Sequence, residues 1–184
     1  GTDPRPGGKY VYFETLGGGM GARAARDGKD GVQVHITNTS NLPVEAIEQE
    51  YPLRVEEYAL VEDSGGAGQH RGGMGIRRTI RPINHNCEFN GVGERFTNPP
   101  WGLFGGLPGE PGSFKLKNDD GRTTSLPPKA SRVKLTPQDA AIIITPGAGG
   151  YGSPGDRSPE DLDEDKRSGK FTEAYFRRHY TKAD

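Results

Sequence analysis

Cysteine is nearly absent from this sequence, as are long hydrophobic runs and any excess of one charge. The single cysteine, Cys87, excludes an internal disulfide framework and a metal site built from several thiolates. The longest apolar run, residues 140–144, is far below the roughly 18–20 residues that a membrane span needs. With 24 basic and 25 acidic residues, no field directs the chain toward nucleic acid or an anionic membrane. These absences, together with the lack of a signal peptide, predict a cytoplasmic protein.

Hydrophobic residues are also scarce, at 30% of the 184 residues, whereas glycine is abundant, with 29 residues, and proline contributes 15. This hydrophobic fraction is low for a domain that must bury a core of its own. We therefore expect a glycine-rich, loop-rich body that completes its burial against a partner chain. The first residue is glycine rather than methionine, so we expect a processed chain, a trimmed one or a piece of a longer polypeptide.

Short segments rich in β-branched and aromatic residues, separated by turn signals, predict many strands. The fold class expected is β-rich, with mostly antiparallel short strands in a barrel or sandwich and glycine-rich loops between them. The predicted strands are residues 9–16, 32–37, 53–61, 76–83, 88–91, 114–117, 133–135 and 140–145.

Two places favour helix. Residues 43–50 begin with a proline suited to a helix start, and residues 158–180 form a charged, helical C-terminal tail. In the tail, Ser158 and Thr172 are the predicted N-caps, and Gly169 is the predicted C-cap. The composition changes from glycine-rich to charge-rich near residue 155, which predicts a β-rich part at residues 1–155 and a helical tail at residues 156–184.

Two glycine motifs mimic a dinucleotide-binding fingerprint: G-x-G-x-x-A at residues 17–22 and G-x-G-x-x-G at residues 147–152. A fingerprint of that kind needs a following helix whose N-terminus holds the pyrophosphate, and neither motif has one. The interpretation favoured here is close packing of backbone without side chains. The alternative is that the bare backbone lets a substrate or a partner chain approach.

No spacing typical of a metal site is present among the four histidines. His35 lies on the polar face of its predicted strand, either as part of a site wall or as a histidine satisfied by its neighbours. Glu45 and Glu48 share one face of the short helix and could perform acid–base work or bind a cation. A solvated helix face is the competing interpretation.

Several long strings, taken in order, resemble one family. They are residues 12–58 (YFETLGGGMGARAARDGKDGVQVHITNTSNLPVEAIEQEYPLRVEEY), 63–80 (DSGGAGQHRGGMGIRRTI), 93–106 (GERFTNPPWGLFGG) and 126–161 (LPPKASRVKLTPQDAAIIITPGAGGYGSPGDRSPED). Together they resemble the C-terminal half of the hydantoinase B module, which is shared with ATP-dependent 5-oxoprolinase.

The resemblance implies a subunit or fragment of an ATP-dependent amidohydrolase complex that opens cyclic amides such as hydantoin, 5-oxoproline or a lactam. It implies that ATP and Mg²⁺ bind to a partner hydantoinase A-like subunit and that a divalent metal binds to the N-terminal hydantoinase B-like part. It implies that this chain itself binds none of these. The partners implied are those two parts, in a hetero-oligomer. The alternatives are the same module in an ATP-dependent ketone carboxylase of the acetone or acetophenone type, or a purely structural subunit.

Five residues are the predicted substrate contacts within such a complex, and no catalytic residue is assigned. The fork of Arg23 suits a carboxylate or phosphate oxygen, and Asn38 offers both a donor and an acceptor to an amide ring. The full set is Met20, Arg23, His35, Asn38 and Glu45. The alternative is that this cluster only joins the glycine loop to the neighbouring strand.

Overall fold

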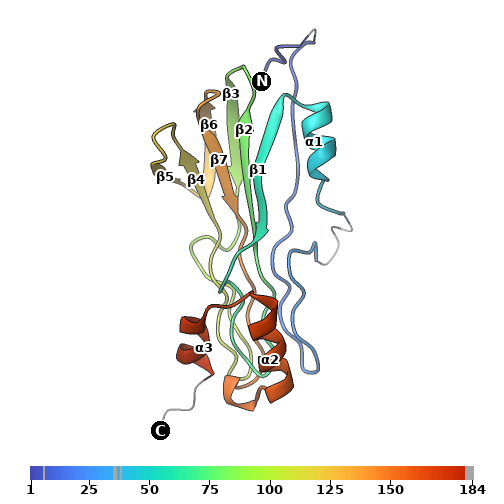
Figure 1. Ribbon diagram of the computed structural model, residues 1–184, viewed down its shortest axis with the longest axis vertical. Helices are drawn as coiled ribbons and strands as arrows, with labels where there is room; N and C mark the ends of the chain where they lie inside the picture. Colours follow the sequence, from blue (N-terminus) through green and yellow to red (C-terminus); the bar gives the residue numbers. More distant parts are fainter. Residues whose placement is uncertain (6, 35–36, 38, 181–184) are drawn as a thin grey trace.

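The computed structural model describes residues 1–5, 7–34, 37 and 39–180. It is elongated, with the strands and one helix gathered at one end and glycine-rich loops with the C-terminal helices at the other (Figure 1). We call these the sheet end and the glycine-loop end. The elements are α1 (Val44–Glu50), β1 (Leu53–Leu60), β2 (Ile76–Pro82), β3 (Cys87–Val92), β4 (Ser113–Lys117), β5 (Thr123–Leu126), β6 (Lys129–Leu135), β7 (Ala140–Ile144), the 3₁₀ turn η1 (Pro154–Asp156), α2 (Pro159–Ser168) and α3 (Glu173–His179).

All strand pairs are antiparallel and form two sheets. The larger sheet has the order β1-β2-β7-β4-β5, and β3 pairs with β6 in a second, two-stranded sheet. The apolar run of residues 140–144 forms β7, which is paired on both sides, as expected for a central strand. The β-rich, antiparallel prediction is confirmed, and the described residues form no closed barrel.

One face of the larger sheet is covered and the other meets solvent. Ile80, Ile143 and Phe114 share the covered face, because residues opposite each other in an antiparallel pair point the same way. Helix α1 packs there through Ile47, and Phe89 of β3 meets the Phe114 ring at a centroid distance of 5.4 Å. The opposite face carries ion pairs between arginine or lysine and glutamate, which is typical of a solvated face.

Residues 9–16 do not form the predicted strand. Tyr10 and Tyr12 pack against the core and Phe13 is exposed, as in a strand, but the segment belongs to no ladder. Side chains hold it instead. The carboxylate of Glu14 pairs with the fully buried Arg78 of β2 at 2.5 Å and also accepts a hydrogen bond from the Leu42 amide. Of the predicted strand at 32–37, residue 32 forms only an isolated bridge, and residues 35 and 36 lie outside the described residues.

The helical predictions are confirmed together with their caps. Ser158 accepts a hydrogen bond from the Asp161 amide, and Thr172 accepts one from the Tyr175 amide. Gly169 ends α2 in the left-handed conformation, at φ 66°. Both helices pack on the glycine loops, where Phe171 and Tyr175 share a core with Met74. The division at residue 155 stays a prediction. No helix among the described residues has the length and apolar character to cross a membrane.

Candidate functional site

The glycine-loop end is built by backbone lying directly on backbone. A Cβ atom added to Gly19 would lie 2.1 Å from the carbonyl oxygen of Gly73, and one added to Gly72 would lie 1.8 Å from that of Ala148. Real Cβ atoms do not approach backbone so closely. Loops from four parts of the sequence therefore interlock here only because they carry glycine. This finding confirms the close-packing interpretation of the glycine motifs.

Most amides of the two fingerprint-like motifs donate hydrogen bonds within the protein. The amides of Gly19 and Ala22 donate to carbonyl oxygens at 3.0 Å, and those of Ala148 and Gly150 donate likewise at 3.0 and 2.9 Å. A phosphate cradle requires such amides to point at the ligand. These loops therefore do not fit a nucleotide. Among the described residues, no group of three or more His, Cys, Asp and Glu side chains is placed to hold a metal ion.

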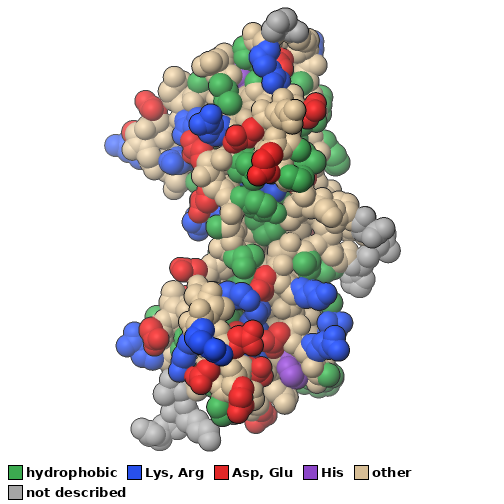
Figure 2. All heavy atoms as spheres, turned by 45° about the vertical axis from the view of Figure 1, so that its right-hand side comes forward, with side chains coloured by type: hydrophobic (Ala, Val, Ile, Leu, Met, Phe, Trp, Pro, Cys, Tyr) green, Lys and Arg blue, Asp and Glu red, His purple; other side chains and the backbone are tan. Residues whose placement is uncertain are grey.

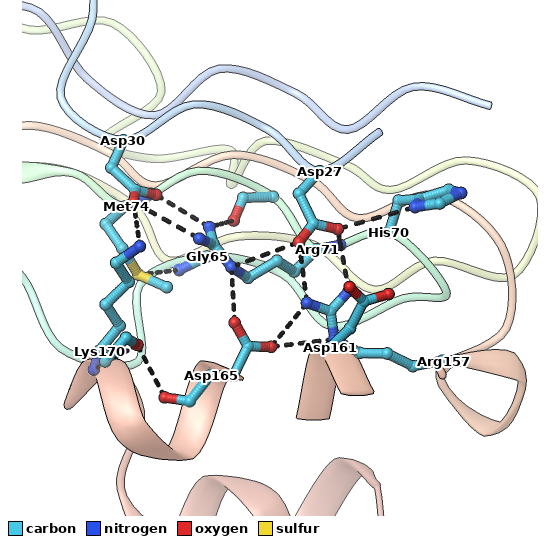
Figure 3. A network of polar contacts seen from close by, with 12 residues as sticks. Asp27, Asp30, Gly65, His70, Arg71, Met74, Arg157, Asp161, Asp165 and Lys170 are labelled. Carbon is cyan, nitrogen blue, oxygen red and sulfur yellow. Dashed lines mark hydrogen bonds and ion pairs between the residues drawn. The ribbon is translucent and has the colours of Figure 1, made fainter. Parts of the chain in front are cut away.

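A buried ion network ties helix α2 to these loops (Figure 3). Asp165 of α2 is only 3% exposed. Its two oxygens accept from the Nε atoms of Arg71, at 3.0 Å, and Arg157, at 2.9 Å. Both guanidinium groups are themselves almost fully buried. Charge pairing of this kind is what lets such groups leave water.

Two further carboxylates, from the loop that follows the first glycine motif, complete the network. Asp27 pairs with Arg157 at 2.8 Å, and Asp30 pairs with Arg71 and Lys170, each at 2.9 Å. Burial alone would raise the pKa of Asp27, but the hydrogen bonds and charges of Arg157 and Arg71 outweigh it and hold the pKa below its ordinary value. The pKa of Asp30 is lowered in the same way, because bonds from the Met74 amide and Lys170 outweigh burial.

The network is balanced in charge and holds the C-terminal residues 157–170 against the glycine loops. Three cations meet three carboxylates, and each carboxylate accepts at least one charge-assisted bond. Two hydroxyl contacts reinforce it. Tyr175 donates to the Gly65 carbonyl, and Thr172 donates to Asp63 at 2.7 Å. These paired charges hold the glycine loops in one arrangement, and His70 borders the network at 3.7 Å from Asp27.

The surface of the glycine-loop end mixes acidic and basic side chains (Figure 2), and one of its loops also exposes aromatic ones. Trp101, Leu103 and Phe104 are exposed, and they lie in the loop that connects β3 to β4. The guanidinium of Arg95 lies 4.2 Å from the centroid of the Trp101 ring, and the Phe104 ring lies 5.1 Å from that of Tyr151. None of these residues was among the predicted contacts, although Arg95 and the three exposed apolar residues lie within the string at residues 93–106, and Tyr151 lies within that at 126–161.

A profile of the family described as "Hydantoinase B/oxoprolinase" matches residues 1–154. The chain belongs to this family. Its relatives include the uncharacterized protein MJ0963 of Methanocaldococcus jannaschii, 41% identical over 89% of this chain, and 5-oxoprolinase 1 of Arabidopsis thaliana, 39% identical over 78%. The chain spans 28% of the length of the first and 11% of the second. The resemblance seen in the sequence is thereby confirmed.

Two solved structures share the fold. The ATP-dependent caprolactamase from Pseudomonas jessenii matches with a TM-score of 0.75 at 28% identity, over 90% of this chain and 29% of that one. A nucleotide-free acetone carboxylase matches with a TM-score of 0.69 at 22% identity, over 89% of this chain and 26% of that one, which shows the fold alone. Both of these proteins are described as ATP-dependent enzymes.

The five predicted contacts of this hydantoinase B chain do not form one cluster in the described residues. Met20 and Arg23 lie at the glycine-loop end: the backbone of Met20 bonds to Lys29 and Gly73, and Arg23 is exposed in a tight turn. Glu45 is exposed on α1, at the sheet end. His35 and Asn38 lie outside the described residues.

Proposed function

We propose that this chain forms part of an ATP-dependent complex that opens cyclic amides of the hydantoin, 5-oxoproline or lactam type by hydrolysis of a C–N bond. The observation that carries the proposal is the joint match to the hydantoinase B/oxoprolinase family over residues 1–154 and to the caprolactamase fold over 90% of the chain. The chain does not act alone in this proposal, because it spans less than a third of the length of those relatives.

The partners in the proposal are an N-terminal hydantoinase B-like part and a hydantoinase A-like subunit. ATP and Mg²⁺ belong to the hydantoinase A-like subunit, and a divalent metal belongs to the N-terminal part. The described residues support this assignment, since most of their glycine-motif amides are occupied by protein carbonyls. The complex would act in the cytoplasm.

Arg23 is the substrate contact that we retain as the main proposal. Its turn closes through mutual backbone bonds with Arg26, of 2.9 and 3.3 Å, and its side chain is exposed beside loops that cannot shift. A guanidinium presented in this way can bind a carboxylate or phosphate oxygen through two parallel hydrogen bonds. Met20 would support that turn from the same loop. Glu45, with His35 and Asn38, would contribute only if the partner parts bring a second surface to the substrate.

Two further candidates remain. The acetone carboxylase fold match favours the same module in ATP-dependent ketone carboxylation. The balanced ion network favours a purely structural subunit. Both are outcomes of the experiment that follows.

The test is activity of the reconstituted complex. Purified with both partners, it should hydrolyse ATP only in the presence of hydantoin, 5-oxoproline or caprolactam, and should release the ring-opened product. ATP turnover that requires acetone and bicarbonate instead would establish the carboxylase alternative. Failure with every one of these substrates would overturn the proposal.

Substitution of Arg23 separates a substrate contact from a structural role. Arg23→Ala should lower kcat/KM about tenfold or more, which is roughly 1.4 kcal/mol. The matched control is Arg122→Ala, an exposed arginine in the turn between β4 and β5. Equal rates for both variants in a normally assembled complex would identify this chain as structural.

A further inference from the structure

Three large apolar side chains of one loop extend into solvent at the glycine-loop end. Trp101 is 62% exposed, Leu103 is 47% exposed and Phe104 is 77% exposed. We call them the aromatic patch. Their exposed surface is on the order of 400 Å², given that an aromatic side chain buries about 150–250 Å² when it is covered completely. In monomeric proteins, exposed apolar patches of this size often mark interaction sites.

The backbone beneath the aromatic patch is held in a conformation that a bulky residue rarely adopts. Phe104 has a φ of 52° and Arg95 a φ of 58°, both in the left-handed region. That region is costly for a residue with a Cβ and persists only where the surroundings impose it. Here the Leu103 amide donates to Gly150, and the Gly106 amide closes a turn onto Leu103, each at 2.9 Å. The strained residue gains little burial in return, so the folding of this chain does not explain the arrangement.

Two of these side chains already have a neighbour within the chain. Phe104 packs on Tyr151, and Arg95 stacks on Trp101. Gly149 lets the backbone of Trp101 lie directly on its own loop, because a Cβ at that position would lie 1.9 Å from the Trp101 carbonyl oxygen. Pre-ordered aromatic and arginine side chains lose little entropy on binding and are the residue types that dominate binding energy at interfaces.

Charges of both signs surround the aromatic patch: Glu94 and Glu110 are exposed, and the Gly109 amide donates to the Pro100 carbonyl at 2.9 Å, which places Glu110 beside Trp101. The Ala22 amide donates to the Gly149 carbonyl at 3.0 Å, which places the turn of residues 23–26 next to the backbone of Trp101. Arg23 and Arg26 are both exposed in that turn, and Arg95 is exposed on the loop itself. A partner that fits this surface presents an apolar centre with polar groups of both charges around it.

We propose that the aromatic patch is the surface on which the remaining part of the hydantoinase B module docks. The inference rests on the proposed function, which requires that part as a partner. The matched structures leave room for such an occupant, since this chain covers only 29% of the caprolactamase chain and 28% of the MJ0963 protein. A stable interface covers about 800 Å² on each partner. The aromatic patch is therefore the centre of the interface, and Arg26 and Arg95 lie at its rim.

The experiment uses the tryptophan itself as the probe, because Trp101 is the only tryptophan in the chain. The full chain is titrated with the N-terminal hydantoinase B-like part of the same complex, with the tryptophans of that part replaced by phenylalanine. Docking on the aromatic patch should shift the Trp101 emission to shorter wavelength as the ring leaves water. If calorimetry showed association but the Trp101 emission did not change, the aromatic patch would not be the docking surface, and the proposed partner would still stand.

Phe104→Gly removes the ring while giving the left-handed position to the residue type that favours it, so the fold should be retained. We expect its affinity for the partner to fall about tenfold or more, with no decrease in the thermal midpoint of the free chain. The matched control is Phe13→Ser, which removes an aromatic side chain that is 85% exposed on residues 9–16. Equal weakening by both variants, or normal affinity of Phe104→Gly, would overturn the proposal.

A second copy of this chain is the remaining occupant that the experiment detects. An emission shift that follows the concentration of this chain alone, together with a doubled mass in light scattering, would replace the proposal with a homodimer. The complete absence of association with the hydantoinase B-like part would overturn both the docking surface and the partner assigned under the proposed function.

Discussion

Asp165→Asn tests the buried ion network most directly. Asparagine keeps the shape of the side chain but removes the charge that Arg71 and Arg157 share through contacts of 3.0 and 2.9 Å. Each guanidinium would then depend on its other carboxylate, Asp30 for Arg71 and Asp27 for Arg157. The substitution therefore leaves two buried cations only partly compensated.

The magnitude follows from what a broken buried pair costs. Removing one partner of such a pair costs about 3–5 kcal/mol, and we expect the lower value because each arginine retains a carboxylate. For a chain of this length, 1 kcal/mol corresponds to roughly 2–4 °C, so the thermal midpoint should fall by about 6–12 °C.

Thermal denaturation followed by circular dichroism measures this effect. The matched control is Asp163→Asn, which neutralises an exposed carboxylate of the same helix α2 and should leave the midpoint nearly unchanged. If Asp165→Asn melted within about 2 °C of this control, the network would not be what secures the helices, and the reasoning would be refuted.

Three further predictions address the loops, the carboxylates and the thiol. Gly19→Ala should lower the free energy of unfolding in urea by about 1–3 kcal/mol, because the added methyl group would lie 2.1 Å from a carbonyl oxygen. The control is Gly21→Ala, whose added methyl group has no atom within 4 Å and which should be nearly neutral. Because the pKa values of Asp27 and Asp30 are lower in the folded chain than in the unfolded one, their ionised forms stabilise the fold. This stabilisation is fully present above about pH 4, where the unfolded carboxyls ionise, and is lost as the pH falls through the folded pKa values. Urea unfolding from pH 6 to pH 3 should therefore show a loss of stability that is smaller in Asp27→Asn, and parallel losses in both proteins would contradict this assignment. Burial raises the pKa of the Cys87 thiol, so iodoacetamide at pH 8 should alkylate the native chain more slowly than the urea-unfolded one, and equal rates would argue against that burial.

Local signals in the sequence were sufficient for the helices and most strands. The caps at Ser158, Thr172 and Gly169 depend on neighbours within a few residues, so the sequence carries them completely. Residues 9–16 show the limit of the alternation rule. The β-branched and aromatic residues predicted a strand, but they could not show that the ion pair of Glu14 with Arg78 holds this segment in place of a hydrogen-bonded ladder.

The ion network could not be predicted from the sequence, because its members are far apart along the chain. Asp27 and Arg157 are separated by 130 residues. Asp165 lies in a helix in which most residues are charged, so its sequence suggests that all of the acidic side chains face solvent. The candidate site was harder still. The glycine motifs correctly predicted that backbone packs closely on backbone, and the alternative, approach of a substrate or a partner chain, is not what these glycines allow at their contacts with Gly73 and Ala148. The exposure of Trp101 and Phe104 depends on the conformation of an irregular loop, which the spacing of hydrophobic residues in the sequence does not predict.

The long reach of the network has a consequence for how this protein folds. Glycine-rich loops lose more conformational freedom on ordering than other segments do, and contacts distant in sequence form slowly. The loops around Asp27 and Arg71 receive their balancing charges from residues 157–170, so their final arrangement must wait until that part of the chain has been synthesised. The sheet end needs less of the late chain, because β1 and β2 pair within thirty residues and the last strand to join, β7, ends at Ile144, before residues 157–170. We therefore expect the two ends to become ordered in sequence, with the sheet first and the glycine loops last.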